Sequence, residues 1–172
     1  MATFGERLLR AARLDRAVYE EVEQDRTATG QALAVVALSS VATGVGLSAG
    51  AQGIVVGLVA GVIAWAVWAA LIYWIGAKML PEPDTRADWG ELARTLGFAS
   101  TPGLLRVLGV VPVLGELVFL VTGVWMLVAT VVAVRQALDY RSLPRAIGVC
   151  VVGWLAQVAV FYLLTQLVRP AA

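Results

Sequence analysis

The sequence has no histidine, and its single cysteine, Cys150, lies within an apolar run. These absences exclude a disulfide framework and the histidine-dependent chemistry of many hydrolases and metal sites. No aspartate lies inside a long apolar run, so a pair of intramembrane catalytic aspartates is excluded as well. We therefore predict no catalytic residue, no metal ligand and no cofactor, and we expect the protein not to be an enzyme.

Charge is missing from residues 27–77, and two further uncharged runs cover residues 117–134 and 146–168. An α-helix needs about 20 apolar residues to cross the hydrocarbon core of a bilayer. Hydrophobic residues make up 60% of the chain, against roughly 45–50% in ordinary soluble domains. The strands of a membrane barrel would alternate apolar and polar residues, and these runs do not. The sequence therefore predicts an all-α membrane protein.

The lengths of these runs predict a polytopic helix bundle with five transmembrane spans and N-terminal amphipathic surface helices. Residues 1–27 form the N-terminal cytoplasmic segment, and residues 28–172 form the membrane domain. We expect the spans at about 28–48, 54–77, 92–111, 114–134 and 146–168.

The N-terminal segment begins with apolar residues and arginines on opposite helix faces, namely Phe4, Leu8 and Ala12 against Arg7, Arg10 and Arg13. Such a helix either lies on an anionic membrane surface or packs on its own protein. Asp15 is a suitable N-cap for a second helix, which is acidic and faces water or a partner.

Basic residues are distributed unevenly over the two sides of a five-span bundle. Arg169 alone falls on one side, and the other side carries Arg7, Arg10, Arg13, Arg16, Arg26, Lys78, Arg86, Arg94, Arg135, Arg141 and Arg145. Basic loops stay in the cytoplasm. We predict a multi-pass protein of the cell (plasma or inner) membrane, with its N-terminus in the cytoplasm and its C-terminus outside.

Glycines recur at every fourth position at the start of the second span, at Gly53, Gly57 and Gly61. One face of this helix therefore lacks side chains, and another helix can approach it closely. The first span, with Ala42, Gly46 and Gly50 at matching spacing, is one candidate for the occupant of this groove, and a second copy of the chain is the other.

The third span is interrupted by helix-breaking residues at Pro102, Pro112 and Gly115. It is either one kinked helix or a surface helix followed by a second helix that starts at Pro102. We favour a broken element that still crosses the membrane. Arg106 and Glu116 flank its end, and we predict that they form an intramembrane polar pair or line a small polar cavity together, unless both extend to the headgroups.

The order of several motifs resembles bacterial members of the Yip domain family, named for Ypt/Rab-interacting proteins. These motifs are Trp89-Gly-Glu-Leu-Ala-Arg-Thr-Leu-Gly-Phe-Ala99, Pro102, Pro112 with Gly115, Trp125 and Ala133-Val-Arg-Gln-Ala-Leu138. The resemblance implies five spans with a cytoplasmic N-terminus. In eukaryotes it also implies vesicle-membrane roles through small GTPases, but the Asp-Leu-Tyr-Gly-Pro stretch of those proteins is missing here.

Two functions fit this sequence. The first is a non-enzymatic scaffold or interaction protein whose partners are membrane lipids, other membrane proteins, or a second copy bound through the glycine face. The second is a small transporter or channel subunit with a site at the broken third span. A net charge of only +1 gives no indication of nucleic-acid binding.

Overall fold

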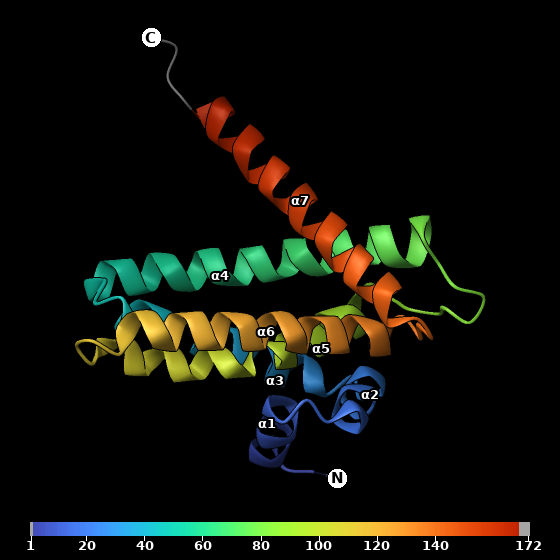
Figure 1. Cartoon of the computed structure of the whole chain (residues 1–172), viewed down its shortest axis with the longest axis horizontal. Helices are drawn as coiled ribbons and strands as arrows, with labels where there is room; N and C mark the ends of the chain where they lie inside the picture. The colour runs from blue at the N-terminus through green and yellow to red at the C-terminus, as the bar shows by residue number, and fades with distance from the viewer. Residues whose placement is uncertain (1, 169–172) are drawn as a thin grey trace.

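The structure, a computed structural model, describes residues 2–168, and no strand occurs among them. Two short N-terminal helices precede four long helices, and a broken element lies between the second and third of these long helices (Figure 1). In chain order the elements are α1 (Phe4–Ala12), α2 (Arg16–Gln24), α3 (Ala28–Gly46), α4 (Gly50–Ile72), the π-helix η1 (Tyr73–Met79), α5 (Trp89–Ala99), the 3₁₀-helix η2 (Thr101–Val110), α6 (Gly115–Ala137) and α7 (Leu143–Val168). The predicted all-α fold is confirmed.

Local capping explains where two of the helices begin. The Asp88 carboxylate accepts a hydrogen bond from the Glu91 amide at 2.8 Å, and the Glu91 carboxylate accepts one from the Asp88 amide at 2.7 Å. This reciprocal pair fixes the start of α5 directly after the polar linker. At α2, the Asp15 side chain accepts from the Ala17 amide at 3.0 Å, which confirms its predicted N-cap role.

Four helices are long and apolar enough to cross a membrane among the described residues: Ala28–Gly46, Gly50–Met79, Gly115–Ala137 and Leu143–Leu163. The protein is therefore a multi-pass membrane protein. The remaining predicted span, at 92–111, consists of two short helices, α5 and η2, which meet at Ser100. Because the ring of Pro102 has no N–H, a new helix can start there but the α-helical ladder of α5 cannot continue through it.

The two short helices connect opposite ends of the bundle. At one end, the Tyr140 hydroxyl donates to the Gly76 carbonyl at 2.9 Å, beside the linker that leads into α5. At the other end, Gly46 at the end of α3 lies against the Arg106 backbone in η2. With rises of about 1.5 Å per α-residue and about 2.0 Å per 3₁₀-residue, α5 and η2 together span about 36 Å, which is enough for a membrane crossing.

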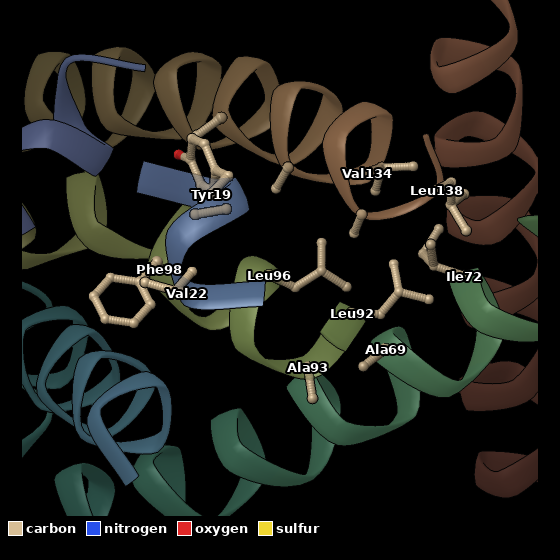
Figure 2. Packing of buried hydrophobic residues seen from close by; sticks show 14 of the residues in the cluster. Tyr19, Val22, Ala69, Ile72, Leu92, Ala93, Leu96, Phe98, Val134 and Leu138 are labelled. Atoms are coloured by element: carbon tan, nitrogen blue, oxygen red, sulfur yellow. The ribbon is translucent and has the colours of Figure 1, made fainter. Parts of the chain in front are cut away.

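The buried core joins the N-terminal helices to the membrane helices. Figure 2 shows Tyr19 of α2 in the same cluster as Leu92 of α5, Val134 of α6 and Ile72 of α4. The Tyr19 hydroxyl donates to the Ala11 carbonyl at 3.1 Å, so its one polar atom is satisfied inside this cluster. The N-terminal segment is thus packed against the membrane helices.

The arginines of α1 bind acidic residues of the chain itself. Arg7, which is 3% exposed, forms ion pairs with Glu21 at 3.0 Å and Asp25 at 2.7 Å. Arg10 binds Asp15 at 2.7 Å and the same Glu21 at 2.8 Å. Of the two interpretations of α1, packing on its own protein is therefore the one that the structure shows for these side chains.

The last helix leaves the bundle. Whereas α3 packs along α4, α7 crosses α4 and then points away from the other helices (Figure 1). Its first turns are packed, with Ala146 and Val149 fully buried. Beyond Gln157, Val158 and Phe161 are 48% and 45% exposed, so the second half of α7 projects into the surroundings of the bundle.

Candidate functional site

A cavity of about 430 Å³ lies between the long helices and the broken element. Its polar lining comes from hydroxyls of α3, from Arg106 of η2 and from Gln157 of α7, and the glycine face of α4 forms another wall. The cavity therefore brings together two features that the sequence left separate: the glycine face and the arginine of the broken span.

The glycine face of α4 is covered at one end only. An added Cβ at Gly61 would overlap the Ser40 hydroxyl of α3, so the two helices touch there. At Gly57 an added Cβ would meet no atom within 4 Å, and at Gly53 it would meet only Ala49, which directly precedes α4. The first span, α3, was predicted to fill this groove. It diverges from α4 beyond Gly61, and the space between the two helices is part of the cavity.

Gly46, predicted to face α4, instead packs against η2 and α6. An added Cβ would overlap the Arg106 carbonyl oxygen and would lie 3.3 Å from the Phe119 ring. The end of α3 therefore turns toward the broken element. This contact holds the backbone of Arg106 in place beside the cavity, where its side chain forms part of the lining.

Arg106 interacts with hydroxyls and an aromatic ring. Its Nε donates to Thr122 Oγ1 at 3.2 Å, and its Nη1 is 3.5 Å from Thr43 Oγ1, at the long limit of a hydrogen bond. The guanidinium carbon lies 5.4 Å from the centre of the Phe119 ring, within the range of a cation–π contact. These partners hold the side chain, and within residues 2–168 no carboxylate forms an ion pair with it.

Glu116 lies apart from Arg106. It is exposed in the first turn of α6, where a carboxylate is stabilised by the helix dipole, and it does not line the cavity. Among residues 2–168 no ion pair joins it to Arg106. The structure places Pro112 in the turn after η2 and Gly115 at the first position of α6, which accounts for the helix break there.

The charge of Arg106 has an electrostatic consequence. A charged side chain at membrane depth without compensation costs at least about 2.5 kcal/mol. Neutral hydroxyls accept hydrogen bonds from the guanidinium but carry no opposite charge, whereas a carboxylate or phosphate supplies that charge and can bind the planar fork with two oxygens. The cavity is therefore suited to an anion.

The hydroxyl partners of Arg106 were missed by the sequence analysis. Serines and threonines inside a membrane helix often bond their own backbone, and Thr122 does donate to the Val118 carbonyl at 2.7 Å. A signal was nevertheless present, because Ser39 and Thr43 are four residues apart on one helix face. That spacing predicts a polar stripe, but not the residue that it faces.

A second group of titratable side chains lies outside the membrane-spanning segments, where α2 meets α5. Arg94 is 6% exposed and donates to the backbone carbonyls of Val22 at 2.9 Å and of Glu23. Burial raises the pKa of Glu23 to about 8, and the neighbouring charges of Asp139, Glu91 and Glu20 add to this increase. The group has no metal-binding arrangement: nowhere in residues 2–168 are three or more metal-ligating side chains placed to hold an ion.

Comparison with known protein families gives one match. A family model described as the Yip1 domain covers residues 15–166. The chain belongs to the Yip1 domain family. The match includes all four candidate membrane helices as well as α5 and η2, and it confirms the resemblance found in the sequence. A search of curated proteins and a search of solved structures each found no match.

In this Yip1-domain protein, the cavity lies entirely within the matched residues, whereas α1 precedes them. The family match therefore covers Arg106 and the glycine face. It does not cover Arg7 or Arg10, whose ion pairs reach from α1 to the first matched helix.

Proposed function

We propose that this Yip1-domain protein is a non-enzymatic membrane scaffold that associates with other membrane proteins or with a second copy of itself through α7. The observation that carries this proposal is the departure of α7 from the bundle (Figure 1). An apolar helix that leaves its own bundle offers a whole flank to another helix in the membrane.

Contacts along α7 divide it into two halves. An added Cβ at Gly153 would lie 2.8 Å from Ile72, which marks a close approach to α4. Gln157 donates to the Ala64 carbonyl at 3.4 Å. Beyond this point the apolar side chains of Phe161 and Leu163 are 45% and 60% exposed. The second half is therefore the part of the helix that a partner would cover.

The glycine face supports association less well than α7 does. Gly57 opens into the cavity inside the chain, so a partner helix could reach it only by entering that cavity. The opposite face of α4 exposes branched residues, with Val55 and Val56 at 60% and 61%. These residues fit contact with lipid chains, the other predicted partner.

We further propose that the N-terminus is cytoplasmic and the C-terminus lies outside, in the plasma or inner membrane. Support comes from the end of the bundle where the Tyr140 hydroxyl contacts the carbonyls of Gly76 and Leu80. Basic residues gather in the sequence around these contact residues: Lys78 lies between Gly76 and Leu80, and Tyr140 is within five residues of Arg135, Arg141 and Arg145. Arg169, the one basic residue predicted outside, is not among the described residues.

A photo-crosslinking amino acid placed at Val158 or Phe161 in the native membrane tests association through α7. We expect one defined protein adduct, either a partner or a second copy. Leu117, which is 56% exposed on α6, is the matched control and is expected to give lipid adducts only. Lipid adducts alone at all three positions would contradict the proposal. Loss of the adduct in a Gly57→Leu variant would move the contact to the glycine face.

The cavity favours a second candidate function, that of a small transporter or channel subunit. Broken helices at membrane depth often line substrate sites, and η2 contributes Arg106 to this one. Flux of a solute into reconstituted vesicles that is lost in an Arg106→Ala variant would place this function above the scaffold.

A further inference from the structure

We propose that the cavity binds an anionic amphiphile, with its phosphate or carboxylate group on Arg106 and its hydrocarbon chain along the glycine face of α4. The binding site combines one charged residue with a helix face on which glycines leave free space. It does not depend on association through α7, and the experiment below measures lipid binding and not cross-links.

The first step concerns charge. Arg106 is the one ionisable side chain that lines the cavity in the described part of the chain. Its two hydrogen bonds go to Thr122 and Thr43, and the guanidinium has further N–H groups beyond the two that these bonds use. A phosphate or carboxylate matches the planar fork of a guanidinium and supplies the missing counter-charge.

The second step concerns the other polar groups of the cavity. Ser40 donates to the Val36 carbonyl and Thr43 to the Ser39 carbonyl, both at 2.8 Å. The Gln157 amide donates to the Ala64 carbonyl at 3.4 Å. These donors are already used within the protein, so the one charge that the lining offers to an anion is that of Arg106, and the lining beside these groups can accept a weakly polar or apolar chain.

The third step concerns shape. The cavity follows α4 from Gly53 to Trp68, a distance of about 22 Å at the rise of an α-helix. Space along this wall comes from the missing side chains, since an added Cβ at Gly57 meets nothing within 4 Å. Apolar side chains of Leu96 and Met126 line the cavity from α5 and α6. A long, narrow space with one charged end fits an amphiphile better than a small ion.

The fourth step concerns access. Arg106 lies next to Gly46, the last residue of α3, so the charged end of the cavity is close to one end of the bundle. A lipid headgroup at the bilayer interface is at a comparable depth, because arginine side chains near helix ends extend to it. At this end of α4, α7 no longer runs against it and points away from the bundle (Figure 1).

Two sources can supply the anionic group: a phospholipid of the surrounding bilayer or a free anion. The test therefore uses two probes. The full-length protein is purified in a neutral detergent and exchanged into nanodiscs of equal parts phosphatidylglycerol and phosphatidylcholine with identical chains. Native mass spectrometry then counts the lipids that stay bound. Inorganic phosphate is titrated separately in zwitterionic micelles, with the thermal midpoint of unfolding as readout.

We expect the wild-type protein to retain phosphatidylglycerol in preference to phosphatidylcholine. Arg106→Gln removes the charged hydrogen bonds and should lower this preference about tenfold or more. Arg86→Gln, a change of an exposed arginine in the polar linker, is the matched control and should retain the wild-type preference. Gly57→Leu fills the space for the chain and should lower retention of phosphatidylglycerol while Arg106 is still present.

Equal retention of both lipids by the wild-type protein would overturn the proposal, and so would an unchanged preference in Arg106→Gln. A free ion would be assigned, and the amphiphile overturned, by the following result. Inorganic phosphate raises the thermal midpoint equally in wild type and Gly57→Leu, this effect requires Arg106, and no lipid is retained. If Arg106→Gln does not fold, the wild-type lipid preference and its loss in Gly57→Leu decide the matter alone.

Discussion

The α3 side and the α4 side of the bundle are both built from helices apolar enough to cross a membrane, but they differ in packing. In the most apolar stretch of α3, 39% of the residues are buried. In that of α4 with η1, only 6% of the residues are buried. On the α3 side, glycines let backbones come close, as at Gly97, where an added Cβ would be 3.0 Å from the Ala32 carbonyl oxygen. On the α4 side, Gly57 faces open space. Small residues therefore allow close packing but do not impose it, because a second helix must also be held at the right angle.

The largest effect that would break this comparison is expected from Gly46→Ala. The new methyl group would overlap the Arg106 carbonyl oxygen, and a backbone atom cannot move aside as a flexible side chain can. We expect a loss of about 3 kcal/mol or more in the free energy of unfolding, at the upper end of overpacking effects. Yield of monodisperse protein and the thermal midpoint measure it. A variant as stable as the wild type would show that α3 and η2 are not held in contact.

A smaller loss is expected when the ion-pair network of α1 is cut by Arg7→Met. The change leaves Glu21 and Asp25 without their buried partner, although these carboxylates are 30% and 19% exposed. We expect about 2–3 kcal/mol, below the roughly 3–5 kcal/mol of a fully buried pair. Limited proteolysis of the N-terminal segment reports the detachment of α1. Arg13→Met, at an exposed position, is the control and should leave the cleavage rate unchanged.

A pH effect is expected where α2 meets α5. The pKa of Glu23 is raised from its usual 4.5 to about 8, mainly by burial, so the folded state holds the proton more tightly than the unfolded state. The stabilisation is complete below about pH 4.5 and is lost as pH rises through about 8. Protection of α2 from proteolysis should therefore fall between about pH 4.5 and about pH 8 and change little above that.

Glu23→Gln cannot release this proton and should remove the pH dependence. In Glu20→Gln the dependence should persist with a lower midpoint, because the charge of Glu20 is one of those that raise the pKa of Glu23. The same pH dependence in wild type and Glu23→Gln would assign it to another group.

The smallest effect is expected at the open position of the α4 side, from Gly57→Ala. A Cβ there meets no atom, and alanine is the better helix former by about 0.8–1 kcal/mol. We expect an unchanged or slightly raised thermal midpoint. A loss comparable to that of Gly46→Ala would mean that α3 or a partner closes on the glycine face, and the contrast between the two sides would disappear.

Several features of the fold were predictable because they depend on residues close together in the chain. The capping pair of Asp88 and Glu91 spans three residues, and the N-cap at Asp15 spans two. The apolar runs likewise predicted the membrane helices from composition and length alone. For the broken element, Pro102 correctly marked the position where a new helix begins.

Other features depended on contacts between distant helices. The pairing of Arg106 with Glu116 was predicted from their proximity in sequence, but η2 is a 3₁₀-helix. Over the four residues from Pro102, 3₁₀ winding turns a side chain about 80° farther than α winding does. Arg106 consequently meets Thr122 and Thr43, which come from two other helices.

The sequence by itself determined that this chain is an all-helical Yip1-domain membrane protein, because hydropathy, capping and small-residue spacing are local properties. The tertiary structure decided what the glycine face and Arg106 contact. The direction of α3 leaves Gly57 uncovered, and the winding of η2 turns Arg106 into the same space. Neither direction is encoded within one helix, since each results from how several helices pack together.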